Sequence, residues 1–207
     1  MQGSTVNDQP AINYQSTSSA EGAKHEEHPD LRMFGVLVFL AGETMLFAGL
    51  FAAFLIYRAV VPVWPPLGTP ELELLLPGIN TIILISSSFV MHRGQSAIKN
   101  NDTKGLRLWF GITAVMGALF LVGQLYEYSH LEFSLTTNLF TSCFFVLTGF
   151  HGLHVTVGLL LILFVLIRNQ EPGHYSSEKH FGVEASELYW HFVDVVWIVL
   201  FILVYLL

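Results

Sequence analysis

Residues 33–57 read MFGVLVFLAGETMLFAGLFAAFLIY, and Glu43 is the one charged side chain in this run. The hydrocarbon core of a bilayer is crossed by an α-helix of about 20 mainly apolar residues. The stretch is long enough and apolar enough to span a membrane, so it predicts a transmembrane helix early in the chain.

Further along the chain, similar apolar runs follow at short intervals. Hydrophobic residues make up 53% of the 207 residues and charged residues 12%, and the charged share is roughly half that of a soluble domain. We therefore expect an all-α fold, a polytopic membrane helix bundle with five transmembrane helices, in one domain at 33–207. The predicted spans are about 33–58, 74–92, 106–128, 138–167 and 184–206.

The first thirty-two residues have a different composition, with many Ser, Thr, Asn and Gln followed by acidic residues. A secretory signal needs a basic start and a short apolar stretch, and neither is visible here. Such a segment cannot bury enough apolar surface to fold. We expect residues 1–32 to form a disordered cytoplasmic tail.

Basic residues indicate how the helices cross the membrane. Eight of the nine Lys and Arg residues fall before the first span or in the second and fourth loops, and Arg58 is the exception. Cytoplasmic loops carry an excess of Lys and Arg, so we expect a cytoplasmic N-terminus and an external C-terminus. The formal charge of −7 argues against a nucleic-acid partner.

Polar side chains inside the spans are candidates for function, because they are costly unless they face protein or water. Glu43 either has such a role or simply hydrogen-bonds a neighbouring helix and fixes packing. At 100° per residue, Glu184, Glu187, His191 and Asp194 share one face of the last span, and three-apart residues such as His191 and Asp194 can pair. The candidate buried polar residues are Gln124, Glu127, His151, His154, His191 and Asp194.

The first span also carries small residues at heptad spacing, Gly35, Gly42 and Gly49. Small residues let two membrane helices approach closely. This face is therefore predicted to be a packing seam.

These polar residues are of the types that hold metals, so a metal- or haem-binding membrane enzyme is one alternative. A di-iron bundle needs Glu-x-x-His motifs on two helices, and no span has one. Haem ligation would need histidines that face each other across two helices, which the spacing does not specify. A transporter is the other class, but no internal repeat supports it. We expect no metal site in this chain.

Several motifs stand in order along the chain: VWPP at 63–66, GFHGLH at 149–154 and YWHFVDVVW at 189–197. Gln124 with Glu127 and Tyr128, and the 180–182 segment with Glu184, complete the set. From about Arg32 to the C-terminus the chain resembles the cytochrome c oxidase subunit III family of haem–copper terminal oxidases, in its five-helix bacterial form.

The resemblance implies a non-catalytic subunit of a proton-pumping oxidase in a bacterial plasma membrane. Such a subunit has no haem or copper of its own; those cofactors belong to its partners, subunits I and II. It stabilises the catalytic subunit, supports proton uptake and binds membrane phospholipids. The electron donor of the complex is expected to be cytochrome c, and the alternative within the family is a quinol oxidase.

The resemblance also assigns roles to single residues. It implies lipid-binding or buried-carboxyl roles for Glu43, Arg168 and Glu184. Two leading helices of the seven-helix form are absent, so one wall of the family's lipid cleft is missing or comes from another subunit. Glu187 stands where the family pattern leads us to expect an apolar residue.

Overall fold

The computed structural model describes residues 31–66, 69, 73–171 and 173–207, and this part of the chain is entirely helices and connecting loops. Most of the expected tail, residues 1–30, lies outside the described residues. Leu31 and Arg32, which we assigned to the tail, begin the first helix. The helices are α1 (Leu31–Val60), α2 (Leu75–Lys99), α3 (Thr103–His130), α4 (Leu139–Arg168), α5 (Phe181–Phe201) and a terminal π-helical turn, η1 (Ile202–Leu206).

Five helices, α1 to α4 and α5 with η1, are long and apolar enough to cross a membrane. The prediction of an all-α bundle with five spans is therefore confirmed. Helix α5 begins at Phe181, three residues before the predicted start of the last span.

Side chains in the loops fix where two helices begin. The Asp102 side chain accepts from the Gly105 amide at 2.8 Å and caps α3. Asn138 and Thr141 cap α4 reciprocally, each side chain accepting from the other's amide, at 2.9 and 3.0 Å. Such caps satisfy amides that have no partner inside the helix.

Helix α5 lies at the centre of the bundle and carries its two largest buried side chains, Trp190 and Trp197. Each indole N–H donates to a hydroxyl of α2, Trp190 to Ser87 and Trp197 to Thr81, both at 2.9 Å. The Trp190 ring also fills the space against Gly117 of α3, where an added Cβ would lie 2.5 Å from it. Through these contacts α2, α3 and α5 form one tightly packed unit.

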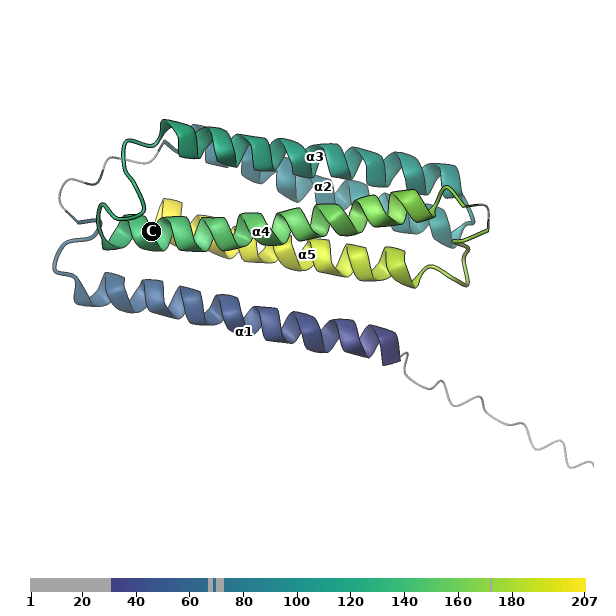
Figure 1. Cartoon of the computed structure of the whole chain (residues 1–207), viewed down its shortest axis with the longest axis horizontal. Coiled ribbons are helices and arrows are strands. Elements are labelled where there is room, and N and C mark those ends of the chain that lie inside the picture. Colours follow the sequence, from purple (N-terminus) through teal and green to yellow (C-terminus); the bar gives the residue numbers. More distant parts are fainter. Residues whose placement is uncertain (1–30, 67–68, 70–72, 172) are drawn as a thin grey trace, which may run out of the picture.

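Helix α1 lies along one side of this unit, against α4 and α5 (Figure 1). A Cβ added at Gly35, Gly42 or Gly49 would meet no atom within 4 Å. No described part of this chain packs there, so the predicted seam is wrong as an intrachain contact. The α1 face that does pack is aromatic, and Phe47 and Phe54 are buried on it.

The two ends of the bundle differ in the loops that they carry. The start of α1 lies at the same end as the α2–α3 and α4–α5 loops, and the C-terminus lies at the other end (Figure 1). Two contacts join the loops at the first end: the Asn101 amide group donates to Ser177 Oγ at 3.1 Å, and the Ser177 amide donates to Asn101 Oδ1 at 2.8 Å.

Candidate functional site

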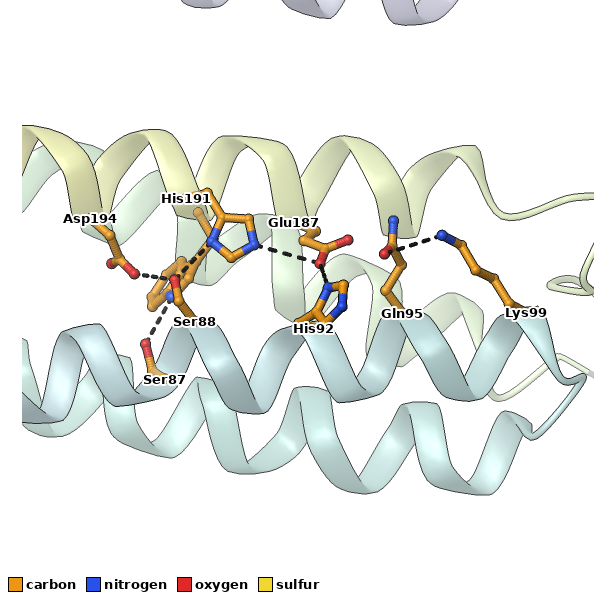
Figure 2. Close-up of polar contacts among 9 residues, drawn as sticks. Ser87, Ser88, His92, Gln95, Lys99, Glu187, His191 and Asp194 are labelled. Carbon is orange, nitrogen blue, oxygen red and sulfur yellow. Dashed lines mark hydrogen bonds and ion pairs between the residues drawn. The ribbon is translucent and has the colours of Figure 1, made fainter.

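A row of polar side chains runs between α2 and α5 (Figure 2). His92 Nδ1 lies 2.9 Å from Glu187 Oε1, and His191 Nε2 lies 3.5 Å from the same oxygen. His191 Nδ1 lies 2.9 Å from Ser88 Oγ, and the Ser88 hydroxyl donates to Asp194 Oδ2. We call His92, Glu187, His191, Ser88 and Asp194 the α2–α5 row.

The two ends of this row differ in burial, and His191 between them is 41% exposed. The His92 side chain is 66% exposed and the Glu187 side chain is 7% exposed. At the far end Asp194 is buried, and its Oδ1 has no hydrogen-bond partner among the described residues. Three members of the face predicted for the last span, Glu187, His191 and Asp194, thus contact α2, and Ser88 stands between His191 and Asp194.

A second polar contact joins α1 to α4. Glu43 Oε2 lies 3.0 Å from His154 Nε2, and the other ring nitrogen, Nδ1, lies 2.7 Å from the Phe150 carbonyl oxygen. Phe47 covers the His154 ring edge-on, with centroids 4.9 Å apart. The Glu43 side chain is 21% exposed, so it lies at the edge of the packed unit rather than deep inside it.

The predicted polar residues of α3 belong to two further groups. The Gln124 amide donates to the Thr148 carbonyl at 3.1 Å, beside a contact of 2.6 Å between the Tyr128 and Thr148 hydroxyls. Glu127 instead accepts from the Tyr205 hydroxyl of η1 at 3.0 Å. These groups tie α3 to α4 and to the end of the chain.

His151 is fully buried, and neither ring nitrogen has a hydrogen-bond partner among the described residues. Its ring lies against Trp197, with centroids 4.8 Å apart, and meets the Phe120 ring edge-on. The polar candidates are therefore distributed over separate groups along the bundle, rather than joined in one network.

Residues with an implied lipid role lie apart from one another. Arg168 ends α4 and pairs with Glu171 at 3.7 Å, while Glu184 pairs with His180 at 3.1 Å. Arg168 lies fourteen positions after His154, the partner of Glu43, on α4, a helical distance of roughly 21 Å. Near Arg168, burial raises the pKa of the Tyr175 hydroxyl, and the Arg168 charge opposes that shift.

Neither Ser88 nor His92 is among the site residues predicted from the sequence. The available signal was Ser86–Ser88, a polar triplet inside a mainly apolar span. Glu187, which lacked an explanation, is the residue that links two histidines. Within the part of the chain that the structure describes, no group of three or more His, Cys, Asp or Glu side chains could hold a metal ion.

Comparison with known proteins identifies the family. A family model described as cytochrome c oxidase subunit III matches residues 15–207. "Cytochrome c oxidase subunit 3" of Synechocystis sp. is 74% identical over 187 residues, which cover 90% of this chain and 80% of that protein. The protein of the same name from Thermostichus vulcanus is 56% identical over 199 residues, covering 96% and 98% of the two chains.

A more distant relative shows how far the similarity extends. "Cytochrome c oxidase subunit 3" of Aedes aegypti is 39% identical over 180 residues, which cover 83% of this chain and 68% of the insect protein. The region that the family model matches, residues 15–207, includes all the helices described above. The chain therefore belongs to the cytochrome c oxidase subunit III family and is an integral membrane subunit of an oxidoreductase complex.

Proposed function

We propose that this chain is a non-catalytic subunit that stabilises the catalytic subunit of its oxidase and supports proton uptake. Its partners are subunits I and II, which hold the haem and copper. The observation that carries this proposal is the family match over residues 15–207.

The histidines inside the spans that the structure describes do not fit a haem or copper site. His154 contacts Glu43 and the Phe150 carbonyl, and His191 contacts Ser88 and Glu187. His151 lies on the same helix as His154 and is enclosed by Phe120 and Trp197. No two of these rings face each other across a space that a metal or porphyrin would occupy, so no electron-transfer step is assigned to this chain.

The supporting role is tested by comparing the oxidase complex with and without this chain. We expect the complex that lacks it to lose activity after fewer turnovers and to take up protons more slowly. Haem content is measured in both preparations to show that the redox centres remain. Equal turnover lifetime and equal proton uptake would contradict the proposal.

We further propose that the complex takes its electrons from cytochrome c, as the names of the relatives suggest. The donor binds on other subunits, so the test uses the whole complex. Oxygen consumption is measured with reduced cytochrome c and with a quinol as alternative donors. Faster turnover with the quinol would assign the chain to a quinol oxidase instead.

The complex is proposed to lie in a bacterial-type plasma membrane, with the start of α1 on the cytoplasmic side. The basic residues near the helix ends lie toward that side, namely Arg93, Lys99, Arg107 and Arg168, as is expected of cytoplasmic basic residues.

We also propose that Arg168 contacts a phospholipid headgroup whose acyl chain runs along α4 toward Glu43. Native mass spectrometry of Arg168→Gln complexes should then show less retained phospholipid than the wild type.

A further inference from the structure

The α2–α5 row is continuous from an exposed imidazole to a buried carboxyl. Its links measure 2.9 Å from His92 to Glu187, 3.5 Å from Glu187 to His191 and 2.9 Å from His191 to Ser88. Ser88 then donates to Asp194. Every member has a side chain that can accept and donate a proton. His92 and Ser88 come from α2, and the other three come from α5, where Glu187 and His191 lie one turn apart (Figure 2).

When Asp194 is ionised its carboxylate can only accept, and this sets the direction of the hydrogen bonds at the buried end. A serine hydroxyl has one proton to donate, and that of Ser88 is directed to Asp194 Oδ2. The contact between Ser88 and His191 therefore requires His191 Nδ1 to carry the proton and Ser88 to accept it. Nδ1 is protonated, so the other nitrogen, Nε2, is free to receive a proton from Glu187.

From this arrangement we infer that the α2–α5 row is a one-proton relay between Glu187 and the buried Asp194. In the forward step the Glu187 O–H bond breaks as an N–H bond forms at His191 Nε2. The His191 Nδ1–H bond breaks as a new O–H bond forms at Ser88. The original Ser88 O–H bond breaks as an O–H bond forms at Asp194 Oδ2.

Charge and atoms balance in this step. Glu187 gains one negative charge and Asp194 loses one, while His191 and Ser88 are neutral before and after. The return step runs through the same atoms with each hydrogen bond reversed. No oxidant, reductant or partner is consumed, so the relay is a property of this chain and goes beyond the supporting role proposed above.

Access from outside is provided at two points. The His92 side chain is 66% exposed and contacts Glu187 directly, so it can return a proton to that carboxyl. The His191 side chain is 41% exposed beside a hollow of about 300 Å³, which is lined by Met33, Gln95, Glu184, Glu187, Leu188 and His191.

Other titratable groups around the row have their own partners. Glu184 contacts His180 on the same helix, and Lys99 of α2 donates to Gln95. On the neighbouring helices, Glu43 of α1 contacts His154 of α4, and Glu127 of α3 accepts from Tyr205. By contrast, His151, which lies against Trp197, has no hydrogen-bond partner among the described residues. The proton path therefore has one end point inside the bundle, Asp194.

The test measures proton exchange at Asp194 in the purified oxidase complex. The infrared band of its protonated carboxyl is identified as the band that disappears in Asp194→Asn. The rate at which this band shifts after transfer to D₂O is then compared between the wild type and Ser88→Ala, which removes the hydroxyl link, and Glu187→Gln, which removes the acid. Glu132→Gln is the control, because it makes the same change at an exposed carboxyl in the α3–α4 loop, outside the row and its hollow.

We expect exchange in Ser88→Ala and in Glu187→Gln to be slower by about tenfold or more, the effect of a modest rise in the transfer barrier. Ser88→Thr, which keeps a hydroxyl, should exchange at close to the wild-type rate, and so should the control. Wild-type rates in both Ser88→Ala and Glu187→Gln would overturn the proposal. It would also fail if Asp194→Asn removed no exchangeable band, or if Glu132→Gln slowed exchange equally.

The relay and the supporting role can fail independently. Co-purification of the variant chain with the haem-bearing subunits reports assembly, while the infrared rate reports the relay. Glu187→Gln replaces one side chain by another of nearly the same shape, so it keeps the test valid even where Ser88→Ala fails to assemble.

Discussion

At the scale of single residues, the contact between Glu43 and His154 holds one shared proton. A carbonyl oxygen can only accept, so the 2.7 Å contact with Phe150 places a proton on His154 Nδ1. The 3.0 Å contact between Nε2 and the Glu43 carboxyl then contains one further proton. Whether that proton is on nitrogen or oxygen, removal of either partner leaves a polar group without a partner between two membrane helices.

The first prediction follows from this shared proton. Glu43→Gln should assemble normally, because the amide N–H of Gln can donate to His154 Nε2 and so keep one proton in this contact. Glu43→Ala and His154→Ala should each lower the free energy of unfolding by about 1–3 kcal/mol, the cost of an unsatisfied buried group. Thermal denaturation of the complex measures this.

A neighbouring residue provides the control for that experiment. Thr44→Ala alters the next position on α1, where the hydroxyl bonds only the Leu40 carbonyl of its own helix. In a double-mutant cycle, additive effects of Glu43→Ala and His154→Ala would show that the two residues do not interact.

At the scale of helices, Trp190 determines how closely α3, α4 and α5 approach. A Cβ added at Gly117 would lie 2.5 Å from its ring, and one added at Gly158 would lie 2.8 Å from it. Trp190 is completely buried and its indole is tethered to Ser87, so it cannot move aside easily. Close packing of this kind drives association where lipid removes the hydrophobic incentive.

The second prediction compares two glycines of α3. Gly117→Ala should destabilise the chain by about 1–3 kcal/mol, because a methyl group is forced into a filled space. Gly111→Ala should be neutral or stabilising by up to about 1 kcal/mol, because an added Cβ there meets nothing within 4 Å and Ala favours helix. Thermal unfolding of both complexes checks the signs. Equal effects would show that Trp190 does not limit the packing.

At the scale of the whole molecule, the sequence was informative about the helices and less so about their neighbours. The common face of Glu184, Glu187 and Asp194 follows from 100° per residue, since a helix repeats regularly. Its partner Ser88 is 106 residues from Asp194, and no local rule specifies which helices meet. Likewise, the small size of Gly42 was visible, but not that an added Cβ there would meet no atom of the described residues within 4 Å.

The third prediction concerns the orientation of the whole bundle. In a Cys143→Ser background, single cysteines are introduced by Thr136→Cys in the α3–α4 loop and Ser177→Cys in the α4–α5 loop. An impermeant maleimide added to intact cells should label the first and not the second, because basic loops stay inside. Labelling of the second should appear after permeabilisation. The reverse pattern would contradict the proposed orientation.

The contact between Glu43 and His154 also has a consequence for biosynthesis. Glu43 is made 111 residues before its partner, so at about 5–20 residues per second it waits on the order of ten seconds at the ribosome. During that interval α1 enters the bilayer with an unpaired carboxyl. Inserting a charged side chain at the centre of a membrane helix costs about 2.5–3.5 kcal/mol. Its fifteen Leu, Ile, Val and Phe residues offset this at about 0.3–0.6 kcal/mol each, so α1 can be inserted well before the helix that holds it is synthesised.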